Sequence, residues 1–317
     1  MKRQTIAAAP SAVAAIALLL CCSPGAQASV LFSYNGFGST SGLTLVGNSA
    51  TTSTSDGTVM RLTPASSSQA GAVYNTTAVT LGTNATFSTQ FQFRFTNPGG
   101  VDPADGITFV ITSTPSGLGG SGFGMGYSGS SAHSLAIEFD TYNNSTAGGG
   151  LGAFAAEPNS SNHVAIDVGG VLTNTASTSV YGNASCGFAG GTPAQNANAA
   201  AGCMSNGDLW TVNISFDGSS LTVTLTDPAK GTTFSALNAY PINIASILGT
   251  NAAYVGFTAS SGAGWENHDI VNWTFSNSAT ISSAPPSVPA LSDCGICALG
   301  LMLAASATLL LRRQAVA

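Results

Sequence analysis

The densest group of side chains able to bind a cation lies in two neighbouring runs, SLAIEFDTYNN and EPNSSNHVAID. The first run contains Glu138 and Asp140, and the second contains Glu157 and His163. Residues two apart on a β-strand face the same side of a sheet, so Glu138 and Asp140 project together. Two adjacent carboxylates repel each other unless a cation neutralises them, and this spacing therefore predicts a metal site.

The ligand types indicate which ions this site would take. Oxygen ligands alone suit Ca²⁺, whereas carboxylates with one imidazole suit Mn²⁺ or a similar transition ion. The predicted metal ligands are Glu138, Asp140, Tyr142 through its backbone carbonyl, Asn144, Glu157 and His163. A plainer interpretation stays open, in which Glu138 and Asp140 are solvent-facing strand residues and His163 merely opens the next strand.

Short strands are the elements that would position these side chains. Only 6% of the 317 residues are charged, and β-branched or aromatic runs are separated by turn clusters. The runs are ATFSTQFQFRFT, GITFVITS, SLAIEFDTY, HVAIDV, LWTVNISFD, SLTVTLTD, AYVGFTA and DIVNWTFS. Many alternate with a period of two, as in Phe91, Phe93 and Phe95, which predicts one buried and one solvent-facing side. The pattern predicts an all-β chain folded as a sandwich of two antiparallel sheets.

Two local signals add detail to this fold. Asp217 and Gly218 lie between two alternating runs, which predicts a hairpin from Ile214 to Leu225. A helical turn is expected only at Ile242 to Leu248.

The N-terminus has the composition of a secretory signal. Lys2 and Arg3 precede an apolar run from Ala12 to Leu20, and an A-x-A cleavage site follows at 26–28. Residues 1–28 are therefore a predicted signal peptide, and we expect the protein to be exported.

The C-terminus carries a second apolar segment. Within residues 288–313, the stretch from Cys294 to Leu311 precedes Arg312 and Arg313, and it is just long enough to cross a bilayer. Residues 279–287, rich in Ser, Ala and Pro, form a predicted linker. The run VPALSDC resembles the start of bacterial sorting signals of the PEP-CTERM type, with Cys294 in place of a Trp. That resemblance implies sorting to the cell envelope, the cell surface or the extracellular matrix of a bacterium, and a plain membrane anchor is the alternative.

Charge and cysteine usage limit the partners. Between residues 29 and 278, Arg61, Arg94 and Lys230 are the only strong bases against twelve acids, so nucleic acid is not an expected partner. Cys186 and Cys203 are the only cysteines of that span, and export to an oxidising compartment favours a disulfide between them.

Four motifs of residues 29–278 resemble, in order, those of the legume-type (L-type) lectin domain. They are FSYNGF, ADGITFVI, SLAIEFDTYNN with NHVAIDV, and YVGFTASSGAGWENHDIVNWTF. The resemblance implies a concanavalin-like jelly-roll sandwich that binds glycans or exopolysaccharide without catalysis. The sequence leaves open whether the protein forms a homo-oligomer.

The resemblance also assigns the metal ligands. Glu138, Asp140 and His163 would bind Mn²⁺, and Asp140, Tyr142 and Asn144 would bind Ca²⁺, with Asp140 bridging the two ions. Where the family has a further Asp before Pro, this chain has Glu157, and Asn159 is the alternative ligand.

The same resemblance predicts the sugar-binding residues. Asp105 would follow a cis peptide bond and accept hydrogen bonds from sugar hydroxyls, and Asn144 would serve both Ca²⁺ and the sugar. A backbone amide would come from Gly122 or Gly124 in a glycine-rich loop, and further backbone donors from Ala263 and Gly264. Trp265 is either an apolar platform for a sugar ring or a core residue.

Two other functions compete with this interpretation. β-Glucanase-type glycoside hydrolases share the sandwich and carry a third acid on the strand of the Glu-Asp pair, but here Asn143 and Asn144 stand where that acid would fall. The other alternative is a surface or matrix structural protein that does not bind sugar, which the Glu157 departure keeps open.

Overall fold

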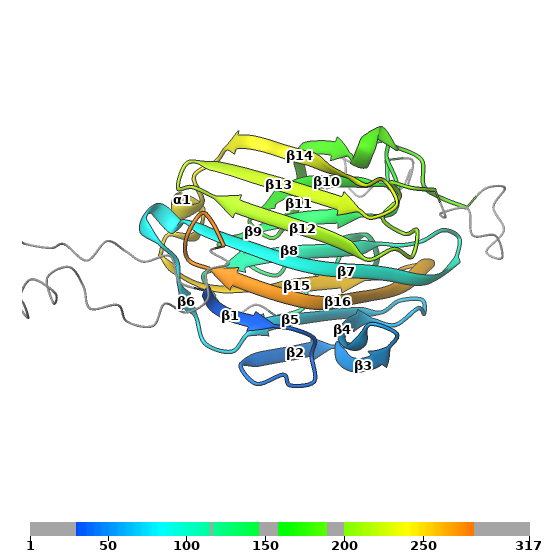
Figure 1. Ribbon diagram of the computed structural model, residues 1–317, viewed down its shortest axis with the longest axis horizontal. Helices are drawn as coiled ribbons and strands as arrows, with labels where there is room; N and C mark the ends of the chain where they lie inside the picture. Colours follow the sequence, from blue (N-terminus) through cyan, green and yellow to red (C-terminus); the bar gives the residue numbers. More distant parts are fainter. Residues whose placement is uncertain (1–29, 115–116, 146–157, 189–199, 282–317) are drawn as a thin grey trace, which may run out of the picture. The chain divides into compact units, whose positions relative to one another are not determined.

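Two antiparallel sheets make up the computed structural model, which describes residues 30–114, 117–145, 158–188 and 200–281 (Figure 1). The first eight-stranded sheet has the order β14 (Thr232–Pro241), β13 (Ser220–Asp227), β12 (Trp210–Phe216), β7 (Phe87–Gly100), β16 (Gly264–Ser276), β4 (Gly57–Thr63) and β3 (Ala50–Thr54), and β1 (Val30–Tyr34) also pairs with β16. The second has the order β11 (Val171–Ser179), β10 (His163–Val168), β9 (Ser134–Asp140), β8 (Gly106–Thr112), β15 (Ala252–Ser260), β5 (Ala70–Asn75) and β2 (Leu43–Gly47), and β6 (Val79–Thr80) also pairs with β15.

Among the described residues, helical structure is confined to short turns. They are the 3₁₀ turns η1 (Thr83–Ala85), η2 (Gly122–Gly124) and η3 (Val180–Gly182), and the helix α1 (Ile244–Leu248). The predicted all-β antiparallel sandwich is therefore confirmed, and the helical turn falls inside the predicted segment. The side-chain oxygen of Asn243 caps α1 by accepting from the Ser246 amide at 2.9 Å.

The core between the sheets is built from the alternating apolar residues that the sequence indicates. Phe91, Phe93 and Phe95 of β7 are fully buried. The ring of Phe91 packs edge-on against Phe257 of β15 and Phe139 of β9, with ring centroids 4.8 and 5.7 Å apart. Burying such rings removes a large apolar area from water, so this layer fixes the two sheets face to face.

The predicted hairpin joins β12 and β13, where Phe216 pairs with Leu221. The Asp217 carboxylate accepts from the amides of Ser219 and Ser220, each at 2.8 Å. Gly218 has φ +99°, a conformation that other residues rarely adopt.

The second sheet departs from the predicted alternation. Every residue of β8 and β9 is buried, including those whose side chains point away from the core. The reason is that the glycine-rich loop folds over this outer face, where Tyr127 packs in a small cluster with Ala72, Val110 and Ala136. Glu138 and Asp140 are 1% and 3% exposed. They are therefore not the solvent-facing strand residues of the plainer interpretation.

Several predicted segments lie outside the described residues. They are the signal peptide (1–28), the C-terminal segment (288–313), most of the linker (279–287) and the candidate ligand Glu157. Within the described part of the chain, no helix has the length and apolar character needed to cross a bilayer.

Candidate functional site

Three predicted metal ligands converge at the paired ends of β9 and β10. Ligand atoms of Glu138, Asp140 and His163 all lie within 4.8 Å of one another, and all three residues are buried. The pairing explains the convergence, because His163 sits opposite Asp140 in the antiparallel register. His163 Nε2 lies 3.1 Å from Glu138 Oε1. A buried pair of carboxylates with an imidazole is the donor set that a transition ion prefers, so these residues fit such an ion.

The sequence interpretation missed two buried groups beside this triad. Asn174 Oδ1 lies 3.0 Å from His163 Nε2. Asp167, on the same face of β10 as His163, accepts from the amides of Thr173 and Asn174 at 2.7 and 3.0 Å. Burial, followed by the charge of Glu138 and a hydrogen bond with it, raises the pKa of Asp167 well above its ordinary value. The signal for Asp167 was available, since a residue four positions after His163 on one strand shares its face.

The peptide bond between Ala104 and Asp105 is cis, and Asp105 is 4% exposed. The Asp105 amide donates to the carbonyl oxygen of Ser260 at 2.9 Å, and its own carbonyl accepts from the Thr141 amide at 3.1 Å. Gly106 pairs with Asp140 across β8 and β9. Asp105 therefore lies directly beside the three candidate ligands Glu138, Asp140 and His163, which we call the cation cluster.

The turn that leaves β9 carries the other predicted ligands. The amide of Tyr142 donates to Asp140 Oδ1 at 2.7 Å, and Asn144 follows, partly exposed. Partial burial, followed by the charges of Asp102 and Asp105, raises the pKa of Tyr142 above its ordinary value.

The alternative ligand Asn159 lies against this same turn. Its amide oxygen accepts from Asn143 Nδ2 at 2.7 Å and from Ser145 Oγ at 3.3 Å. Asn159 therefore contacts the turn that carries Asn144.

The glycine-rich loop comes close to Asp105, and the amides of its two predicted donors both make hydrogen bonds to backbone carbonyls. The amide of Gly122 donates to the Ser261 carbonyl, and that of Gly124 donates to the Ser121 carbonyl, each at 3.2 Å. The prediction that one of these amides serves the sugar site stays a prediction. The loop still borders the site, because a Cβ placed on Gly262 would lie 3.4 Å from Gly122 Cα and 3.6 Å from Asp105 Oδ2.

The loop before β16 forms another border of the site. Ala263 is exposed, and its carbonyl accepts from the Val101 amide at 3.2 Å. Gly264 is buried, and a Cβ there would lie 2.1 Å from the Asp102 carbonyl oxygen, so only glycine fits. The indole of Trp265 lies directly against the backbone of Gly99 and Gly100, which makes it a packing residue of this loop.

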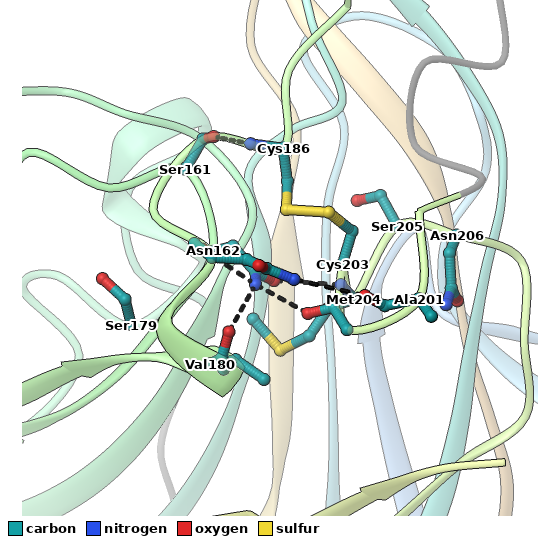
Figure 2. The surroundings of a disulfide bond; sticks show 12 residues. Ser161, Asn162, Ser179, Val180, Cys186, Ala201, Cys203, Met204, Ser205 and Asn206 are labelled. Carbon is teal, nitrogen blue, oxygen red and sulfur yellow. Dashed lines mark hydrogen bonds between the residues drawn. A yellow bond between two sulfur atoms is a disulfide. The ribbon is translucent and has the colours of Figure 1, made fainter. Parts of the chain in front are cut away.

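A disulfide joins Cys186 and Cys203, whose Cα atoms are 5.7 Å apart (Figure 2). The side chain of Asn162, the residue before His163, bonds to the backbone on both sides of Cys203. Its Nδ2 donates to the Gly202 carbonyl at 2.9 Å, and its Oδ1 accepts from the Met204 amide at 2.9 Å. The Cys186 amide donates to Ser161 Oγ at 2.8 Å. The bridged loop therefore supports the segment from which His163 enters β10.

The fold and site together define a lectin-type β-sandwich with a buried cluster of candidate cation ligands at the paired ends of β9 and β10. Residues 29–289 match the legume lectin domain. The chain belongs to that family.

Individual relatives share part of the sequence and the fold. The chain is 28% identical over 211 residues to the basic agglutinin of Psophocarpus tetragonolobus, over 63% of this chain and 72% of that protein. It is 33% identical over 117 residues to a probable L-type lectin-domain containing receptor kinase of Arabidopsis thaliana, over 37% of this chain but only 16% of the kinase. Among solved structures, basic winged bean lectin with Tn-antigen has a TM-score of 0.59 and 23% identity, over 77% of this chain and 96% of that one.

Proposed function

We propose that this protein is an exported, metal-dependent lectin that binds glycans at a shallow site between Asp105 and Asn144 and performs no catalysis. The observation that carries the proposal is the register of β8 and β9. It places Gly106, the residue after Asp105, opposite Asp140 of the cation cluster.

The buried triad supports the metal dependence. Glu138, Asp140 and His163 would hold Mn²⁺ or another transition ion, while Asp140, the Tyr142 carbonyl and Asn144 would hold Ca²⁺, with Asn159 or Glu157 as a further ligand. Bound cations would neutralise carboxylates that burial otherwise penalises.

Sugar recognition would depend on groups of this chain beside the cations. The Asp105 carboxylate would accept hydrogen bonds from two sugar hydroxyls, and the Asn144 amide would donate one. Ala263, which is exposed at the border of the same site, would contact the ligand. Charged acceptors form stronger hydrogen bonds than neutral ones, so Asp105 would contribute most.

Export is proposed from the N-terminal segment and from the disulfide. Disulfides persist in oxidising compartments, and the chain carries one between Cys186 and Cys203. Placement at a bacterial envelope or matrix is proposed on the VPALSDC motif alone. N-terminal sequencing and intact mass of the protein recovered from its host would test both terminal cleavages.

The decisive experiment is a glycan array probed with the purified domain in the presence of Ca²⁺ and Mn²⁺. Retention on a glycan that chelator and Asp105→Asn both abolish is the expected result. Release of sugar from the array would instead support the hydrolase alternative. No binding to any glycan, with metal content verified, would support the structural protein.

A further inference from the structure

Two buried, chemically active residues of β16 take no part in the cation cluster. Glu266 and His268 are both 0% exposed, and Glu266 Oε1 lies 3.5 Å from His268 Nε2. Residues two apart share one face of a strand, so both side chains point into the interior of the sandwich. Each reaches a residue next to the proposed sugar site.

His268 contacts the peptide that follows Asp105. The Gly106 amide donates to His268 Nε2 at 3.2 Å, and His268 Nδ1 lies 2.6 Å from Thr63 Oγ1. A backbone N–H can only donate, so Nε2 is the acceptor and the imidazole proton resides on Nδ1, facing Thr63. His268 thereby connects β16 and β4 of the first sheet to the start of β8 in the second.

Glu266 contacts the residue that follows Asp140. Its Oε1 accepts from Thr141 Oγ1 at 2.8 Å and from Ser205 Oγ at 3.0 Å. The Thr141 amide in turn donates to the carbonyl of Asp105. Glu266 therefore connects the turn after β9, which holds the peptide of Asp105, to the segment that follows Cys203.

A contribution to folding stability does not by itself explain why Glu266 and His268 are buried here. Glu266 Oε2 is buried and has no hydrogen-bond partner among the described residues. A buried carboxylate oxygen without a partner raises the free energy of the folded state, and buried ionic groups are often replaced by apolar residues without loss of stability.

We propose that Glu266 and His268 are positioning residues for sugar binding, which together set the place of Asp105 relative to the turn from Thr141 to Asn144. This inference rests on the proposed lectin function. Glu266 and His268 do not touch the sugar. They act through Gly106 and Thr141, whose positions determine whether Asp105 and Asn144 reach the same ligand.

The test compares sugar affinity, measured by calorimetry at saturating Ca²⁺, with thermal stability in a set of variants. His268→Leu removes the acceptor for the Gly106 amide, and His268→Gln places an amide oxygen near the position of Nε2. We expect His268→Leu to bind the best array glycan about tenfold more weakly, the equivalent of about 1.4 kcal/mol. His268→Gln should restore affinity to within about twofold of the wild type.

Asp269→Asn is the matched control. Asp269 lies on the same strand, is 3% exposed and pairs with Arg61 at 2.7 Å rather than with Gly106 or Thr141. It should lower the melting temperature without changing sugar affinity. If Asp269→Asn loses affinity as His268→Leu does, or if His268→Gln fails to restore binding, the positioning role is wrong.

Thr141→Val tests the same positioning role through Glu266, and it serves if His268→Leu does not fold. It keeps the side-chain shape and removes the hydroxyl that donates to Glu266. We expect affinity to fall several-fold, and wild-type affinity in this variant would overturn the proposal.

Hydrogen exchange of the Gly106 amide separates this inference from the lectin function. If the wild-type protein binds no glycan, the proposed function fails, yet the exchange rates still report the positioning. The Gly106 amide should be protected in the wild type and in His268→Gln and should exchange faster in His268→Leu. Equal protection in all three proteins would refute the proposal.

Discussion

Gly106 and Asp140 lie opposite each other in the pairing of β8 with β9. Asp140 is the residue shared by both proposed ion sites, and Gly106 follows the proposed sugar acceptor Asp105. A Cβ on Gly106 would lie 2.2 Å from the Phe139 carbonyl oxygen, so the two strands approach closely at this point. We therefore expect a change at the cation cluster to affect Asp105, because only one pair of strand residues separates them.

Replacing Asp140 should remove metal and sugar binding together. We expect Asp140→Asn to retain no stoichiometric transition ion by elemental analysis and to bind glycan at least about a hundredfold more weakly, or about 2.7 kcal/mol. Asp56→Asn is the control, because Asp56 pairs with Arg94 at 2.7 Å outside the cluster. Full glycan binding by a metal-free Asp140→Asn protein would contradict the coupling.

Replacing Asn162 should destabilise the fold more than replacing an exposed asparagine. Asn162 is fully buried and its side chain bonds to the backbone at Val180, Asn183, Gly202 and Met204. Asn162→Ala leaves these groups without partners, so we expect a loss of about 2–4 kcal/mol of unfolding free energy. Urea denaturation measures this loss, with the exposed-site variant Asn213→Ala as the control. Equal denaturation midpoints for the two variants would contradict a stabilising role for Asn162.

Removing the disulfide should lower stability and loosen the metal site. The bridge spans 17 residues, for which the chain-entropy model gives about 3 kcal/mol. The double variant Cys186→Ser with Cys203→Ser should unfold at lower urea concentration and bind Mn²⁺ more weakly, because the bridged loop supports the start of β10. Unchanged metal affinity in a clearly destabilised variant would restrict the disulfide to a stabilising role.

The hairpin between β12 and β13 should contribute a pH-dependent stability. Hydrogen bonds from the side chain of Ser219 and from the amides of Ser220 and Ser219 lower the pKa of Asp217 below its ordinary value of 3.8. The unfolded state then binds protons more readily, so the contribution is present above the ordinary pKa and is lost as pH falls through the folded-state pKa. Asp217→Asn should therefore be less stable than the wild type at pH 7, and the difference should disappear at strongly acidic pH. A difference that is constant with pH would exclude the carboxylate as its source.

Local sequence patterns were sufficient for the strands and for much of the site. Glu138 and Asp140 are two apart on one strand, so strand periodicity alone predicts that they project together. The alternation in β7 and β13 likewise predicts the buried rows, and Asp217-Gly218 predicts its turn. Each of these features depends on residues close together in the chain, whose geometry the backbone itself fixes.

Contacts between distant residues required the tertiary structure. Sequence could not show that the amide of Gly122 is taken by Ser261, or that a folded-over loop buries the outer face of β9. Nor could it show that His268 meets Gly106, 162 residues earlier in the chain. The sequence by itself determined the strand pattern and the ligand types of the cation cluster. Only the pairing and stacking of the sheets decided which groups meet at Asp105, because those contacts form between strands whose relative placement no local preference encodes.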